Sequence, residues 1–147
     1  MKRREFIKNT CTGCAVVGVG LLLGSNFLSS CSSSKMTVSK TKAIDGKAII
    51  PLDSMVDGSV KIVRVANYNF DIALKRNGTD CKAIVMMCSH AGHPLVRTGD
   101  GFFCTLHGSH FSGNGAVETG PASKPLMQLP VAINNNQIEI TLLTPTL

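Results

Sequence analysis

The chain has 147 residues, which suits one domain with a single core plus a further segment. With 44% hydrophobic residues, 16% charged residues, 14 glycines and 6 prolines, its composition favours a small domain of strands and turns. The net charge is +6, but residues 1–30 hold four basic residues and one acidic residue (+3), and the remaining +3 is spread without a basic run. Nucleic-acid binding is therefore not predicted.

Residues 1–30 have the features of an export signal: a basic start, an apolar stretch and then small residues up to Cys31. The run Lys2-Arg3-Arg4-Glu5-Phe6-Ile7-Lys8 resembles the twin-arginine export motif, although Lys2 stands where Ser or Thr is usual. Twin-arginine export carries proteins that are already folded, often with a cofactor in place. The resemblance implies a cofactor-bearing domain in a bacterial cell envelope, on the periplasmic or extracytoplasmic side.

The end of this segment indicates how the domain is held at a membrane. Leu28-Ser29-Ser30-Cys31 resembles a lipobox, in which the cysteine receives the lipid that tethers the mature protein. The alternative is an uncleaved anchor from Thr10 to Leu28, which is about long enough to span a bilayer but only weakly apolar. Residues 31–46 are polar and without periodicity, so they are predicted to form a flexible linker before a domain at 47–147.

From Lys47 onward, turn signals recur between short runs rich in β-branched residues, and no stretch has helical periodicity with caps. The fold class is therefore all-β: a small antiparallel sandwich or barrel of about ten short strands. Four hairpins are predicted where residues that tolerate positive φ interrupt these runs: Asn77-Gly78, Gly99-Asp100-Gly101, Gly113-Asn114-Gly115 and Asn134-Asn135-Asn136.

Four side chains at predicted strand ends are the candidate metal ligands: Cys88, His90, Cys104 and His107. Two thiolates and two imidazoles suit either a tetrahedral Zn²⁺ or a [2Fe–2S] cluster with both cysteines on one iron and both histidines on the other. Zinc sites usually place paired ligands as C-x-x-C or H-x-x-x-H, whereas each pair here mixes one Cys with one His. This spacing favours the cluster, and a structural zinc-binding or partner-binding domain is the alternative.

The surroundings of these pairs resemble a Rieske iron–sulfur protein of the cytochrome bc type. The resemblance is carried by Cys88-Ser89-His90-Ala91-Gly92-His93-Pro94 and by Cys104-Thr105-Leu106-His107-Gly108-Ser109-His110-Phe111. It implies a β domain with two cluster-binding loops at one end and one [2Fe–2S] cluster. In that cluster, Cys88 and Cys104 would bind the buried iron, and His90 and His107 the outer iron.

Other positions in these segments take further roles from the resemblance. Ser109 would donate a hydrogen bond to a cluster sulfur, Gly108 would permit a tight turn, and Gly120-Pro121-Ala122 would cover the third side of the cluster. His93 and His110 are predicted to be solvent-facing loop residues, because the site already has four ligands.

Two departures from the bc-type pattern affect the expected properties. Those proteins join their ligand loops by a disulfide between the positions that His93 and Leu106 occupy here, so no such disulfide is expected. They also place a Tyr hydroxyl on a ligand sulfur where this chain has Phe111. Hydrogen bonds to sulfur raise the potential, so with Ser109 alone we expect a value below the bc-type range and above that of ferredoxin-like members.

The function implied is one-electron transfer by an exported, membrane-tethered protein. It would act as an electron-transfer component of an oxidoreductase complex rather than as a stand-alone catalyst, with a cytochrome or a quinol-oxidising complex as redox partner. The sequence offers no nucleophile with its base, no paired carboxylates and no phosphate-binding loop. An oxygenase component is disfavoured, because a mononuclear iron site would need a long additional domain.

Overall fold

The computed structural model describes residues 38–146, which fold almost entirely into strands. These residues include one short 3-10 helix, η1 (Leu52–Ser54), and no helix among them is long and apolar enough to cross a membrane. The predicted export signal lies outside the described residues. The strands are β1 (Val38–Thr41), β2 (Ala43–Ile44), β3 (Lys47–Pro51), β4 (Val60–Val65), β5 (Ile72–Asn77), β6 (Asp80–Val85), β7 (Val96–Thr98), β8 (Gly101–Phe103), β9 (His110–Phe111), β10 (Val117–Thr119), β11 (Gln128–Leu129), β12 (Val131–Asn134) and β13 (Gln137–Thr141).

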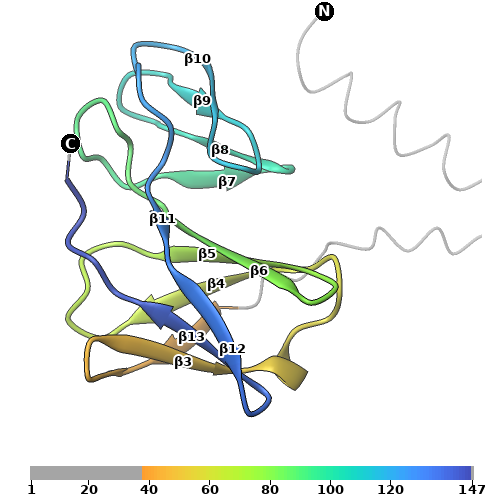
Figure 1. Ribbon diagram of the computed structural model, residues 1–147. Coiled ribbons are helices and arrows are strands. Elements are labelled where there is room, and N and C mark those ends of the chain that lie inside the picture. The colour runs from red at the N-terminus through yellow and green to blue at the C-terminus, as the bar shows by residue number, and fades with distance from the viewer. Residues whose placement is uncertain (1–37, 147) are drawn as a thin grey trace, which may run out of the picture. The chain divides into compact units, whose positions relative to one another are not determined.

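The strands form three sheets (Figure 1). The central sheet has the order β1-β4-β5-β6-β11, and a second sheet has the order β12-β13-β3-β2. The third sheet, β10-β9-β8-β7, lies on the other side of the central sheet from β3, β12 and β13 (Figure 1). Every pairing is antiparallel except that of β1 with β4. The all-β, mainly antiparallel fold class is confirmed.

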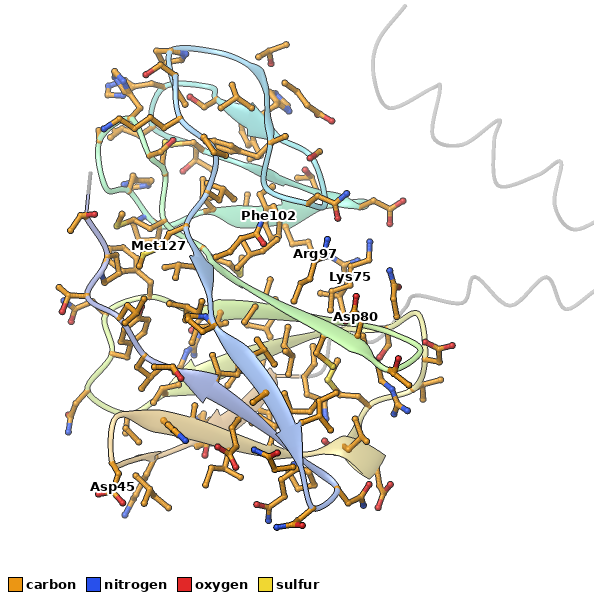
Figure 2. The ribbon with its side chains drawn as sticks, in the orientation of Figure 1. Asp45, Lys75, Asp80, Arg97, Phe102 and Met127 are labelled. Atoms are coloured by element: carbon orange, nitrogen blue, oxygen red, sulfur yellow. The ribbon has the colours of Figure 1, made fainter. Side chains whose placement is uncertain are left out.

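The central sheet is buried on both faces, because its strands carry apolar side chains that project toward each face. Ile62, Ala73 and Ile84 face one another in register and belong to a core that includes Phe102 of β8. Figure 2 shows the Phe102 side chain extending from the third sheet toward the central sheet. The other face packs against the second sheet in a separate core, and each large side chain buried there contributes about 1.5–3 kcal/mol.

All four predicted hairpins are formed. Their turns contain the positive φ angles that Gly and Asn tolerate, such as 59° at Gly78 and 61° at Asn136. From Lys47 onward the described residues contain eleven strands, β3 to β13, where about ten are predicted, and two of these strands, β9 and β11, have only two residues each. Strands this short carry no recognisable alternation in a sequence.

The beginning of the domain differs from the predicted linker over residues 31–46. Residues 38–41 form β1, which pairs with β4 from Val38 opposite Ile62 to Thr41 opposite Val65, and residues 43–44 form β2. Both are edge strands with exposed or half-exposed side chains, so backbone hydrogen bonds hold them rather than apolar burial. Their polar composition gives no strand signal, and strands are thus present within the segment predicted as a linker.

Candidate metal centre

The four candidate ligands lie in two loops next to the third sheet (Figure 1). The first ligand loop, residues 88–94, lies between β6 and β7, and the second ligand loop, residues 104–109, connects β8 to β9. A third loop, residues 120–126, follows β10 and leads toward β11. Sheet pairing of β7 with β8 and of β8 with β9 therefore holds the two ligand loops side by side.

The first ligand loop turns back on itself through its backbone. The Cys88 N–H donates to the His93 carbonyl at 2.8 Å, and the Gly92 N–H donates to the Cys88 carbonyl at 2.8 Å. Gly92 has φ 68°, a left-handed conformation that glycine adopts without steric cost. The loop is therefore closed at its base, and His90 lies at its tip.

The second ligand loop repeats this pattern with different residues. The Cys104 N–H donates to the Ser109 carbonyl at 2.9 Å, and the Gly108 N–H donates to the Cys104 carbonyl at 3.0 Å. Gly108 has φ 77°, so it permits the tight turn that was predicted at this position. Two loops of the same backbone form thus present one cysteine and one histidine each.

The candidate cysteine and histidine ligands differ in how deeply they are buried. Cys88 and Cys104 are each only 1% exposed and belong to the core beneath the loops, whereas His90 and His107 are exposed. The two imidazole rings lie edge to face, with centroids 5.2 Å apart and an interplanar angle of 80°. A buried thiol pair below an exposed imidazole pair is the arrangement that a [2Fe–2S] cluster with two cysteines and two histidines requires.

Backbone N–H groups favour the thiolate form of Cys104. Burial raises the pKa of the Cys104 thiol. Hydrogen bonds from the backbone N–H groups of His107 and Leu106, and from the neighbouring Cys88 thiol, lower this pKa by more than burial raises it. The pKa of Cys104 therefore lies below its ordinary value. The thiolate is the form that ligates metals. Cys104 therefore has the chemistry that an iron ligand needs.

Ser109 is a buried hydroxyl directed at the same site. It is 0% exposed, and its Oγ accepts a hydrogen bond from the Ala122 N–H at 3.2 Å. No residue of the described part of the chain accepts the hydroxyl's own hydrogen. That hydrogen remains available for a group held between the ligand loops, so the buried residues fit a cluster whose sulfur accepts it.

The third loop packs directly on the second ligand loop at Gly120. An added Cβ at Gly120 would lie 2.5 Å from Ser109 Cα and 2.9 Å from the Gly108 carbonyl oxygen, and the residue has φ +97°. Only glycine fits this contact without moving backbone. The predicted cover over the third side of the site is therefore a close backbone-to-backbone contact.

Replacing Gly120 with alanine should accelerate loss of the cluster, because the third loop must move away from Ser109. The matched control is Gly99→Ala, which places alanine at φ +55° with no atom within 4 Å. The control carries only the backbone cost of about 1–2 kcal/mol. Bleaching of the visible absorption measures the loss, and equal rates in the two variants would contradict the role of this contact.

Among the residues next to the candidate ligands, the exposure of some was predicted correctly, but the hydrogen bonds of others were not. His110 is exposed, as predicted, and its ring contacts Phe103 with centroids 4.6 Å apart. His93 is half-buried, and its Nε2 lies 3.3 Å from Thr105 Oγ1, a bond that was not predicted. The hydrogen bonds of Ser89 and Thr105 were not predicted. The sequence shows that each of these residues directly follows one of the two candidate ligand cysteines.

The structure shows the surroundings of the positions at which this chain departs from the bc-type pattern. Cys81, Cys88 and Cys104 are all free, so residues 38–146 contain no disulfide. Leu106 is 51% exposed beside the imidazole pair, and Phe111 is 1% exposed among the core residues that include both thiols. Within the same residues, no three His, Cys, Asp or Glu side chains are grouped closely enough to hold a single metal ion.

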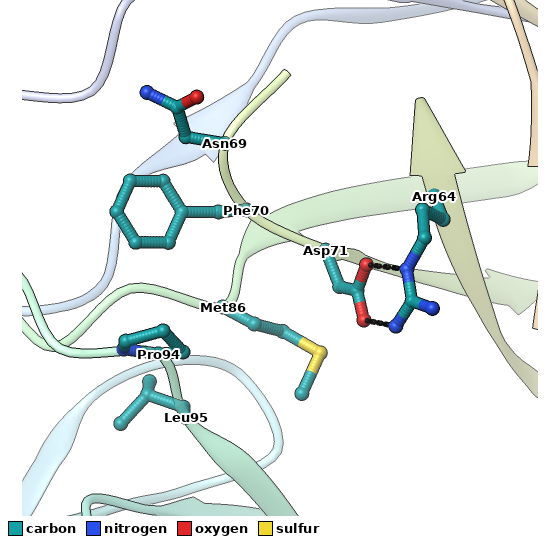
Figure 3. Close-up of a pocket in the computed structure, with 7 residues that line it drawn as sticks. All are labelled: Arg64, Asn69, Phe70, Asp71, Met86, Pro94 and Leu95. Carbon is teal, nitrogen blue, oxygen red and sulfur yellow. Dashed lines mark hydrogen bonds and ion pairs between the residues drawn. The ribbon is translucent and has the colours of Figure 1, made fainter. Parts of the chain in front are cut away.

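A small pocket lies beside the first ligand loop (Figure 3). It has a volume of about 240 Å³ and contains no candidate ligand. On one side, Arg64 Nε donates to Asp71 Oδ1 at 2.8 Å and its second nitrogen lies 2.6 Å from Oδ2. The remaining lining is Asn69, Phe70, Met86, Pro94 and Leu95. The one carboxylate of the lining, Asp71, is paired with Arg64, so this pocket is not part of the metal centre.

Comparison with known families gives a match over most of the described domain. The family model described as "Rieske [2Fe-2S] domain" matches residues 46–131. This match decides between the two centres that the ligand set allowed, in favour of one [2Fe–2S] cluster over zinc. The same segment contains all four candidate ligands, Ser109 and the third loop.

Individual relatives are more distant. The chain is 34% identical over 73 residues to the cytochrome b6-f complex iron-sulfur subunit 2 of Nostoc sp., covering 48% of this chain and 41% of that one. It is 28% identical to the ubiquinol-cytochrome c reductase iron-sulfur subunit of Rickettsia typhi, covering 94% and 92%. Among solved structures, a chain of a hyperthermophilic respiratory Complex III has a TM-score of 0.49 at 18% identity, covering 91% and 92%.

Proposed function

Because the chain belongs to the Rieske [2Fe–2S] domain family, we propose that it transfers single electrons as an exported, membrane-tethered component of an oxidoreductase complex. The observation that carries this proposal is the exposed pair of imidazoles, His90 and His107, above a buried pair of thiols. When bound, the cluster supplies a one-electron redox couple. A partner's redox centre can approach the outer side of such a site without an intervening layer of protein.

Different residues of the chain would hold the cluster in the core and expose it to a partner. Cys88 and Cys104 lie in a core with Phe102 and Phe111, which excludes water from the inner side. His90 and His107 extend to the surface from loops with a closed backbone. The described surface therefore favours electron exchange at the imidazole side, with rigid ligands that need little rearrangement.

The surface around the imidazoles is almost uncharged. Residues 88–94 and 104–109 contain no Asp, Glu, Lys or Arg, and the third loop contributes only Lys124. Leu106, half exposed, adds an apolar side chain there. A partner would therefore dock through apolar and ring contacts, and the docking rate would depend little on ionic strength.

The partner that we propose is a quinol-oxidising complex. Relatives named as subunits of cytochrome b6-f and ubiquinol-cytochrome c reductase complexes support it, although the chain covers only 41% of the Nostoc subunit. A shuttle to another extracytoplasmic oxidoreductase is the second form of the same proposal. The arginine pair and Cys31 of the sequence support export and a lipid tether.

The experiment uses the full chain in a bacterium with twin-arginine export. We expect membranes from these cells to show the EPR signal of a reduced Rieske cluster after quinol is added, and Cys31→Ala to release the same signal into the soluble fraction. A cluster that stays oxidised with quinol but is reduced by a soluble extracytoplasmic enzyme would support the shuttle. A protein found in the cytoplasm would contradict the proposal.

A further inference from the structure

The three loops around the metal centre are joined pairwise by three hydrogen bonds. Ser89 of the first ligand loop donates from Oγ to the Lys124 carbonyl of the third loop at 2.5 Å. The Ala122 N–H of the third loop donates to Ser109 Oγ of the second ligand loop at 3.2 Å. His93 Nε2 of the first ligand loop lies 3.3 Å from Thr105 Oγ1 of the second. Each loop is thus bonded to both of the others, and the bonds form a closed ring.

We propose that this ring of three hydrogen bonds, with His93, Thr105 and Ser89 as positioning residues, sets how long the protein retains its cluster and how uniformly its ligand histidines are held. The inference deepens the proposed function, because it rests on the cluster site, but it does not depend on the redox partner. Within residues 38–146 no disulfide ties the loops, so side-chain hydrogen bonds provide these cross-connections.

The position of the ring residues explains why they act on the ligands. Ser89 lies between Cys88 and His90 in sequence, and Thr105 directly follows Cys104. A bond from either residue to another loop therefore restrains the backbone on which a ligand is carried. The backbone bonds of each ligand loop close that loop only at its base, so the ring adds restraint to this closure and to the packing of the third loop.

The link between His93 and Thr105 is a direct hydrogen bond between side chains of the two ligand loops. The Thr105 hydroxyl can donate to a neutral ring nitrogen, and it can accept from a protonated one. The bond is therefore available to either form of the ring. His93 is half-buried and Thr105 is exposed, so this bond lies at the surface of the two loops.

A double-mutant cycle on the full holoprotein tests the link. The variants are His93→Ala, Thr105→Val and the double, with cluster loss measured as bleaching of visible absorption in the presence of a chelator without oxygen. We expect each single variant to lose its cluster about threefold to tenfold faster, the factor that one intramolecular hydrogen bond corresponds to. The double should be no faster than the faster single, because both changes remove the same bond. Multiplying effects in the double would overturn the link.

Matched variants separate positioning from a general loss of stability. His110→Ala removes a neighbouring exposed histidine, and Thr98→Val alters a threonine with no side-chain hydrogen bond to the described residues, so both should bleach at the wild-type rate. His93→Gln keeps a side-chain amide that can bond Thr105 and should restore most of the retention. Ser89→Ala should accelerate bleaching, whereas Ser123→Ala in the third loop should not.

A spectroscopic measurement tests the second half of the proposal. Broader EPR lines in His93→Ala and Thr105→Val than in His93→Gln would show that the ligand histidines have become less uniformly held. Unchanged bleaching rates and line widths in both variants would overturn the ring. Retention is measured without any redox partner, so failure of quinol-dependent reduction would count against the proposed function and leave this result unaffected.

Discussion

Replacing His107 with alanine is expected to eliminate the EPR signal of the reduced cluster, because the outer iron loses one of its two protein ligands. Changes in residues that merely support ligands cost roughly 10- to 100-fold in metal affinity, so loss of a ligand itself should cost more. His107→Cys should instead give an altered signal, since a thiolate donates more electron density than an imidazole. The measurement is EPR of the reduced protein together with its iron content.

The matched control for this prediction is His110→Ala. His110 is also an exposed histidine of the same segment, but its ring contacts Phe103 rather than His90. It should retain the signal and the iron content of the wild type. An unchanged signal in His107→Ala, or its loss in His110→Ala, would refute the ligand assignment.

Replacing Ser109 with alanine should lower the midpoint potential by roughly 60–130 mV. A hydrogen bond to a charged group contributes about 1.5–3 kcal/mol, and a one-electron couple shifts by about 59 mV for each factor of ten in its equilibrium constant. The reduced cluster is more negative than the oxidised cluster, so a hydrogen bond from the Ser109 hydroxyl stabilises the reduced form more. Removing this hydroxyl therefore favours the oxidised form and lowers the potential. A redox titration followed by EPR measures the shift.

Ser123→Ala is the control for this titration, because Ser123 lies in the third loop, is exposed and has no side-chain hydrogen bond to the described residues. It should titrate at the wild-type potential. The wild-type value itself should lie below the bc-type range, because Phe111 has no hydroxyl to donate. A wild-type potential near the upper Rieske value of roughly +300 mV would contradict this account of the sulfur hydrogen bonds.

Much of the fold could be predicted because its determinants are local. Hairpins follow from turn residues such as Gly78 and Asn136, whose positive φ is a property of the residue and its neighbours. The edge strand β1 could not be predicted, because its pairing with β4 is parallel and joins residues that are distant in sequence. Its side chains alternate between exposed and half-exposed, which leaves a polar run that resembles a linker.

The sequence alone predicted the candidate ligand set, because Cys88, His90, Cys104 and His107 are residue types that hold an iron–sulfur centre and their spacing resembles that of one family. It also implied the division into inner thiols and outer imidazoles. The structure supplies the physical cause of that division: both cysteines join the core between the central and third sheets, and the closed loop backbones carry the histidines outward.

Only the tertiary structure decided how the three loops are joined. The bonds of the ring connect residues separated by 12, 13 and 35 positions, and their lengths depend on how the sheets pack. A serine or threonine in a loop looks the same in sequence whether its hydroxyl meets water or a distant carbonyl. The sequence shows that positions 93 and 106 hold no cysteine, whereas the hydrogen bonds that tie the loops appear only once packing brings their partners within reach.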